Sequence, residues 1–171
     1  MFTTARLQME ALEQRHAEEL VVALDHAAVG EFIGGPDVTT VAALHHRIDG
    51  LLEGPPAGSS DQRWLNFVVR RTADGIVLGR VEATVYGKWA EIAYLFDPGA
   101  WGHGYATEAV RWLIDYLATD LHVSEIWAAI LHTNVRSIRL IQRVGLVEQP
   151  NPSRTPQSFD PGDLVFGLVL A

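Results

Sequence analysis

The sequence predicts an α/β (α+β) fold, in which a mixed but mostly antiparallel sheet of about seven strands is flanked by about four helices. Three observations predict it. Residues 64–96 contain three successive strand-like segments separated by short turn sequences, which favours an antiparallel meander. Residues 89–131 read as strand, glycine-rich turn, long helix and strand, the pattern of a parallel crossover. Amphipathic segments on either side supply the remaining helices.

Before the meander, the sequence predicts one short strand and two helices. Residues 6–9 form the candidate strand, and residues 11–24 place leucines among charged residues at helical spacing. Thr39 or Thr40 caps a second helix that runs to residue 52. His45 and His46 are adjacent in this helix, so they point in different directions and do not form a metal pair. Residues 54–60 are a loop by their glycine, proline and serine content.

The meander is bounded by turn residues. A strand over residues 64–71 is turned by Asp74-Gly75 into a second strand over residues 76–86, where apolar and polar side chains alternate. Gly87-Lys88 turns the chain again into a third strand over residues 89–96. Three sequential antiparallel strands are therefore expected.

Gly102-His103-Gly104 lies between the third strand and a helix predicted over residues 105–118. The first N–H groups of a helix have no internal partner, and the helix dipole adds partial positive charge there. Small residues before the helix let a pyrophosphate approach the backbone closely. The alternative is that the glycines only make the turn. The chain has no Gly-Lys-Ser/Thr, and the loop lies past its middle, which argues against ATP or NAD as the ligand.

The second half of the sheet is predicted from a strand over residues 124–131, parallel to the strand at 89–96, and from strands over residues 146–148 and 163–170. A loop over residues 151–160 separates the last two. A helix over residues 134–144 follows the first of these strands and ends at Gly145.

This helix carries polar residues on its apolar side. Arg136, Arg139 and Arg143 share one face, whereas Ser137 lies within the opposite, apolar arc and Asn134 heads the same side. An unsatisfied buried polar group costs about 1–3 kcal/mol, so both residues need partners. Either Asn134 caps the helix and Ser137 bonds back to the preceding turn, or both face a ligand between the two parallel strands.

Composition limits the function classes. A chain of 171 residues with 48% hydrophobic and 20% charged residues favours one ordered domain over residues 1–171. The net charge of -8 argues against nucleic-acid binding and mildly favours an amine substrate. The absence of cysteine excludes a disulfide framework, a cysteine zinc site and a cysteine nucleophile. Because the sequence has neither a signal-peptide pattern nor a membrane-length apolar run, we expect a cytoplasmic protein without membrane partners. The composition leaves the oligomeric state open between a monomer and a homodimer.

Two motifs resemble those of a known family. The run WGHGYATEA, from Trp101 to residue 109, resembles the pyrophosphate loop of the GNAT acetyltransferases, usually Gln/Arg-x-x-Gly-x-Gly/Ala. Gly104 and Ala106 match this pattern, and Trp101 replaces the Gln or Arg. The run NVRSIRLIQRVGL at residues 134–146 is similar to N-x-x-S-x-x-x-x-x-K-x-G-F of the RimJ/RimL-like branch, with Arg143 and Leu146 in place of Lys and Phe. The EIAY at residues 91–94 also matches that branch.

The resemblance implies acetyl-CoA as cosubstrate, no metal, and an amine-bearing peptide or small molecule as acceptor. It also implies a GNAT-like sheet whose two parallel strands splay apart, so that pantetheine fills the gap between them. The cofactor-binding residues would then be Tyr94, Leu95 and Phe96 along the pantetheine, Gly102, His103, Gly104, Tyr105, Ala106 and Thr107 around the pyrophosphate, and Asn134 on the pantetheine arm.

Without cysteine, a direct transfer of acetyl to the amine is the simplest reaction. Glu91 is the candidate base, acting through water, although it can equally be a surface strand residue. A backbone N–H near Leu95 would stabilise the oxyanion. Ser137 is the candidate proton donor to the leaving thiolate, because many GNAT enzymes use a tyrosine four residues further on, and that position here is Ile141. His132 is a weaker candidate base.

Two other functions compete with this interpretation. A GNAT-fold protein can bind acyl-CoA without transferring it, as a sensor or interaction protein. A nucleotide-binding α/β domain of another kind would bind NAD rather than CoA. We expect the acceptor to be selected by residues 11–52, 54–60 and 151–161, which match no family motif.

Overall fold

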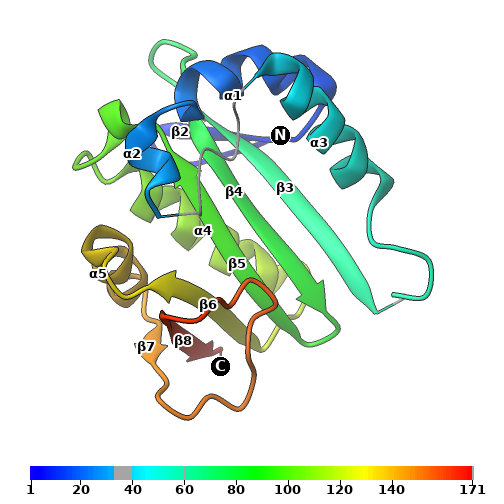
Figure 1. Cartoon of the computed structure of the whole chain (residues 1–171), viewed down its shortest axis with the longest axis vertical. Coiled ribbons are helices and arrows are strands. Elements are labelled where there is room, and N and C mark those ends of the chain that lie inside the picture. The colour runs from blue at the N-terminus through cyan, green and yellow to red at the C-terminus, as the bar shows by residue number, and fades with distance from the viewer. Residues whose placement is uncertain (33–39, 60, 171) are drawn as a thin grey trace.

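A sheet of eight strands runs through the computed structural model, which describes residues 1–32, 40–59 and 61–170, in the order β1-β2-β3-β4-β5-β6-β8-β7 (Figure 1). The strands are β1 (Phe2–Thr3), β2 (Leu7–Ala11), β3 (Gln62–Arg71), β4 (Val77–Tyr86), β5 (Trp89–Phe96), β6 (Glu125–Leu131), β7 (Val147–Glu148) and β8 (Asp163–Val169). Every neighbouring pair is antiparallel except β5 and β6, which run parallel. The predicted meander and crossover are confirmed.

Helices cover both faces of the sheet. They are α1 (Ala17–Leu24), α2 (Ala27–Gly30), α3 (Val41–Glu53), α4 (Tyr105–Thr119) and α5 (Val135–Arg143), with 3₁₀ turns η1 (Gln14–His16) and η2 (Pro98–Ala100). One core cluster joins α4 and α5 to the sheet, and a second joins α1 and α3 to its other face. Figure 1 shows α1, α2 and α3 in front of the upper sheet and α4 behind it, which leaves the lower part of β3, β4 and β5 uncovered in this view.

Three features of the N-terminal region differ from the sequence prediction. The helix expected from Ala11 begins at Ala17, because Ala11 extends β2 and pairs with Phe67 on β3. Leu7 and Met9 are fully buried at a spacing of two, which fixes this segment as a strand. The two-residue β1 and the four-residue α2 were not predicted, since elements this short carry no periodic signal.

The predicted cap of α3 is confirmed at Thr40, whose side chain accepts a hydrogen bond from the N–H of Ala43 at 3.0 Å. Thr39, the other candidate, and Ser60 in the predicted loop lie outside the described residues. At the C-terminal end, β8 inserts between β6 and β7, an order that the sequence analysis did not specify.

Candidate active site

The parallel strands β5 and β6 pair over only part of their length. Their register joins Trp89 with Glu125, Ala90 with Ile126 and Glu91 with Trp127. β5 continues to Phe96 and β6 to Leu131, but within these described residues the two strands have no further paired positions. The sheet therefore opens into a gap beyond Glu91, as the resemblance implied.

The backbone of β5 presents alternate residues to this gap. The N–H of Asp97 donates to the carbonyl oxygen of Leu78 on β4 at 2.8 Å, so in an antiparallel ladder Leu95 also directs its backbone groups at β4. Tyr94 and Phe96 therefore direct theirs at the gap. This corrects the expectation for Leu95, whose N–H is not aimed at a ligand in the gap. The Nε1–H of Trp101 donates a hydrogen bond to the carbonyl oxygen of Phe96 at 2.9 Å.

The glycine loop adopts a geometry that other residues rarely adopt. Gly102 and Gly104 both have φ of +79°, in the left-handed region, and Gly104 is the N-cap of α4. With no cap side chain on Gly104, the first N–H groups of α4 are directed out of the helix end. The turn thus requires its glycines, and the same turn exposes the donors that an anion needs.

Two arginines from distant segments lie against this loop. Arg6 donates from Nη1 to the carbonyl oxygen of His103 at 3.0 Å, and its guanidinium lies 4.6 Å from the centre of the Tyr105 ring. Arg136, in the first turn of α5, holds its guanidinium 4.8 Å from the centre of the Trp101 ring. Two cations therefore lie at a loop that itself carries no arginine or lysine, although Arg6 also pairs with Glu108 on α4 at 2.7 Å, which offsets its charge.

The side chains of Asn134 and Ser137 both have hydrogen-bond partners within the protein. Asn134 is the N-cap of α5, and its Oδ1 accepts from the N–H of Ser137 at 3.1 Å. The Oγ of Ser137 lies 2.7 Å from the hydroxyl of Tyr94 on β5. Burial raises the pKa of Tyr94 to about 12, although its hydrogen bond with Ser137 acts in the opposite direction. Ile141, at the position of the usual family tyrosine, is fully buried in the core.

Glu91 is buried, with 7% of its surface exposed, and both of its oxygens accept backbone hydrogen bonds. Oε2 accepts from the N–H of Gln157 at 2.7 Å, and Oε1 from that of Ser158 at 3.0 Å. These contacts hold the loop between β7 and β8 against β5. Burial raises the pKa of nearby Tyr86, and the negative charge of Glu91 adds to this rise.

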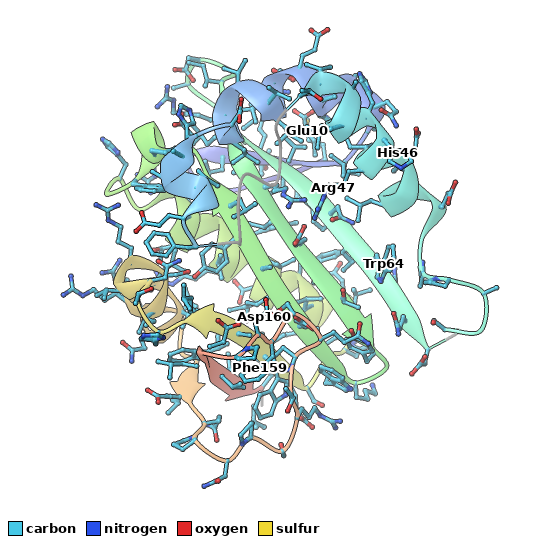
Figure 2. All side chains as sticks on the ribbon, in the orientation of Figure 1. Glu10, His46, Arg47, Trp64, Phe159 and Asp160 are labelled. Atoms are coloured by element: carbon cyan, nitrogen blue, oxygen red, sulfur yellow. The ribbon has the colours of Figure 1, made fainter. Side chains whose placement is uncertain are left out.

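A groove of about 340 Å³ begins at Glu91 and runs over the uncovered strands. Its lining includes Trp64, Glu82, Thr84 and Tyr86 from the sheet and Arg47 and Leu51 from α3. Figure 2 shows Arg47 and Trp64 on one side of the uncovered strands, and Phe159 and Asp160 on the loop opposite. The groove thus has α3 and the 151–161 loop as walls, the segments expected to select the acceptor.

Glu91 and Ser137 lie on opposite faces of the sheet. Side chains alternate along β5, so Glu91 shares its face with Leu95, which packs in the α1 and α3 cluster. Tyr94 lies on the other face, where it packs in the cluster of α4 and α5 and contacts Ser137. The groove at Glu91 and the Tyr94–Ser137 hydroxyl pair therefore lie on opposite faces of the sheet, on either side of the strand that borders the gap.

Comparison with known proteins agrees with this geometry. The sequence model of the family described as acetyltransferase (GNAT) domain matches residues 6–147. This chain belongs to the GNAT acetyltransferase family. The uncharacterized N-acetyltransferase p20 of Bacillus licheniformis is 38% identical over 149 residues, which cover 85% of this chain and 82% of that protein.

Two solved structures share the fold of this GNAT enzyme. The GNAT-family acetyltransferase from Bacillus anthracis has a TM-score of 0.79 at 18% identity, over 98% of this chain and 96% of that chain. The ribosomal-protein-S5-alanine acetyltransferase from Vibrio fischeri has a TM-score of 0.74 at 16% identity, over 98% and 95%. GNAT enzymes use acetyl-CoA, and the exposed turn at Gly102 and Gly104 fits a pyrophosphate.

Several site features were not found from the sequence. Tyr94 was predicted as a backbone contact of pantetheine, and the contact of its side chain with Ser137 was not predicted. The stacking of Arg136 on Trp101 was not predicted either. Glu82 also lies in the groove, where its carboxylate pairs with Arg80 at 3.1 Å. His132, the weaker candidate base, has Nδ1 at 2.9 Å from the carbonyl oxygen of Gly162.

The described residues of this GNAT enzyme hold no group of three or more histidine, aspartate and glutamate side chains arranged to bind a metal ion. Within residues 1–32, 40–59 and 61–170, none of the helices has the length and apolar character needed to cross a membrane.

Proposed function

We propose that this enzyme transfers an acetyl group from acetyl-CoA directly to a primary amine, either a protein N-terminal amine or a small-molecule amine. The observation that carries the proposal is the end of β5–β6 pairing beyond Glu91, with the groove at Glu91 on one face of the sheet and the Tyr94–Ser137 hydroxyl pair on the other. A thioester held in the gap would lie between these two sets of groups.

Acetyl-CoA supplies an activated acyl thioester when it is bound. Tyr94 and Phe96 would hydrogen-bond the pantetheine along the gap, and an N–H from one of them would stabilise the oxyanion. The turn at Gly102, His103 and Gly104, with the N–H groups of Tyr105, Ala106 and Thr107, would hold the pyrophosphate. The side chain of Asn134 would contact the pantetheine arm.

The acceptor amine must lose a proton before it attacks, because free amines have pKa values of roughly 8–10. Glu91 would accept this proton through a water molecule, using lone pairs that its two backbone hydrogen bonds leave over. As the new N–C bond forms and the C–S bond breaks, Ser137 would donate its hydroxyl proton to the sulfur. No covalent enzyme intermediate is needed.

The size of the groove supports the proposed class of acceptor. A volume of about 340 Å³ admits a chain end or a small amine rather than a folded surface. The ribosomal-protein acetyltransferase among the structural neighbours supports a protein N-terminal amine as one of the two candidates. Polar and apolar lining residues alternate in the groove, which is compatible with either acceptor.

The first test is acetyl-CoA binding measured by calorimetry with two substitutions of Gly104. Gly104→Asp places a negative charge where the pyrophosphate would lie and should abolish binding, whereas Gly104→Asn is neutral, has a similar size and also tolerates left-handed φ. We expect the asparagine variant, which adds a similar bulk without the charge, to lose clearly less affinity than the aspartate variant. Equal losses in the two variants would show that the charge is irrelevant, and no wild-type binding at millimolar ligand would refute the proposal.

A second function is favoured by the contacts of Glu91. Both of its oxygens already hold the 157–158 backbone, which is the arrangement of a structural residue in a non-catalytic acyl-CoA-binding protein. Incubation of the wild type with acetyl-CoA and a panel of peptide and small-molecule amines separates the two. Acetylated product supports the enzyme, and binding without product from any amine supports the binding protein.

A further inference from the structure

Within the part of the chain that the structure describes, the hydroxyl of Tyr94 lies within hydrogen-bond distance of two oxygen atoms, and both belong to Ser137. Its Oη lies 2.7 Å from Oγ and 3.2 Å from the carbonyl oxygen of Ser137. A phenol has one proton, so it donates to only one of these oxygens at a time. The shorter distance is the one to Oγ.

Two proton arrangements follow. In the first, Ser137 donates from Oγ to Oη and Tyr94 donates to the carbonyl oxygen, so that both protons are used inside the pair. In the second, Tyr94 donates to Oγ, and the Ser137 proton is free to point at a third atom. Only the second arrangement lets Ser137 donate to a ligand in the gap.

Tyr94 is suited to the donor role. Burial raises the pKa of its hydroxyl to about 12, so the phenol keeps its proton throughout the pH range of an ordinary assay. A hydroxyl that accepts a hydrogen bond also becomes a stronger donor, because the two bonds polarise each other. The tyrosine that many GNAT enzymes place four residues after Ser137 is replaced by the apolar Ile141.

We propose that Tyr94 is a positioning residue for Ser137, donating a hydrogen bond to its Oγ and thereby directing the Ser137 proton at the thioester sulfur. This rests on the direct acetyl transfer proposed above. When the C–S bond breaks, its electron pair goes to sulfur, which takes the Ser137 proton. Tyr94 keeps its own proton and its hydrogen bond to Oγ, while Glu91 releases the amine proton to solvent water and Ser137 regains a proton from solvent water.

The kinetic test is a double-mutant cycle of Tyr94→Phe and Ser137→Ala. Each single variant should lower kcat about tenfold or more, with the KM for acetyl-CoA changed less than about twofold. The double variant should lose no more than the single variants, because the two hydroxyls act as one unit. Tyr116→Phe is the matched control: it removes a hydroxyl at the far end of α4, in the cluster with Phe2 and Trp112, and should leave kcat unchanged.

A binding comparison gives a readout that needs no turnover. CoA should bind the wild type more tightly than desulfo-CoA as the pH rises toward the thiol pKa, because the directed Ser137 proton stabilises the thiolate. Tyr94→Phe and Ser137→Ala should both remove this preference and leave the affinity for desulfo-CoA unchanged. Thermal unfolding confirms that each variant is folded.

Two outcomes would overturn the inference: a Tyr94→Phe enzyme with wild-type kcat, or losses that multiply in the double variant. A preference for CoA over desulfo-CoA that survives in Tyr94→Phe would overturn it as well. If instead the proposed function fails, the wild type will acetylate no amine. The comparison of CoA with desulfo-CoA would then still show whether Tyr94 and Ser137 stabilise a thiolate.

Discussion

Arg136 and Trp101 form a stacked pair at the one loop position where this chain departs from the usual GNAT pattern. The indole is fixed by its hydrogen bond to the carbonyl oxygen of Phe96, and the guanidinium lies over its face. The ring thus acts as a support that holds a cation from α5 beside the loop. The positive charge that the loop lacks at Trp101 is therefore supplied by Arg136 on α5. A motif confined to the loop sequence cannot reveal this contact.

Removing this charge should weaken cofactor binding. Arg136→Ala should raise the Kd for acetyl-CoA about fivefold, which corresponds to about 1 kcal/mol for a partly screened charge pair. The effect should shrink as salt is raised from about 0.05 to about 0.5 M. Calorimetry at both salt concentrations measures it.

Arg139→Ala is the control for this prediction, since Arg139 is an exposed arginine on the same helix. A loss in Arg139→Ala equal to that in Arg136→Ala would mean that general charge on α5, and not the stacked position, matters.

At the scale of elements, an ionic network joins β2, β3 and α1. Glu10 on β2 accepts from Nε of Arg70 on β3 at 2.9 Å and lies 3.0 Å from Nε2 of the fully buried His16. Arg70 also donates to Glu19 on α1 at 2.6 Å. The hydrogen bond from Arg70 lowers the pKa of Glu10 to about 2, with His16 and Arg15 contributing further.

This network should make stability fall at acid pH. Glu10 has a folded-state pKa below its unfolded value of 4.5, so its contribution is complete above pH 4.5 and is lost as the pH falls toward 2. The contribution is about 3 kcal/mol at most. Urea unfolding between pH 2 and 7 measures it.

Glu10→Gln should lower the free energy of unfolding at pH 7 and flatten its pH dependence below 4.5. Glu18→Gln, an exposed position on α1, should leave the pH dependence as in the wild type. An unchanged acid slope in Glu10→Gln would contradict the assignment.

The sequence predicted most of these elements because their signals are local. Turn residues and alternation predicted β3, β4 and β5, and apolar spacing predicted α4. The predicted start of α1 at residue 11 was wrong because the spacing of Leu12 fits both a helix and the end of a strand. The pairing of Ala11 with Phe67 makes this segment part of β2. The position of β8 depends on its pairing with β6 and β7, and the contacts of Glu91 depend on residues 66 or more positions away, as with Gln157, so no local pattern encodes them.

At the scale of the molecule, the C-terminal loop returns to the start of the parallel strand pair. Glu91 holds the N–H groups of Gln157 and Ser158, and Arg154 pairs with Glu125 at 2.8 Å. Both contacts involve residues of the short β5–β6 ladder. The loop that forms one wall of the groove is thereby tied to the same point from which the gap between β5 and β6 opens.

We call the two hydrogen bonds from the N–H groups of Gln157 and Ser158 to Glu91 the clamp. Hydrogen exchange can distinguish this structural role of Glu91 from a role as a base. In Glu91→Ala the amides of Gln157 and Ser158 should exchange about tenfold faster or more, because they lose their acceptors. The amide of Asp160 in the same loop should be unaffected, since it donates to Asp163 at 3.0 Å. Unchanged exchange at residues 157 and 158 would rule out the clamp and leave proton transfer as the role of Glu91.

The short β5–β6 ladder has a mechanical consequence. Among the described residues, three residue pairs join the part of the sheet made of β6, β8 and β7 to the part made of β1 to β5, so little backbone hydrogen bonding opposes a rotation of the two parts about residues 89–91 and 125–127. A ligand lying along the gap would form hydrogen bonds with both parts of the sheet and oppose that rotation. We therefore expect the two parts of the sheet to move relative to each other in the enzyme without its cosubstrate. The bound cosubstrate would take the place of a strand between β5 and β6 and restrict this motion.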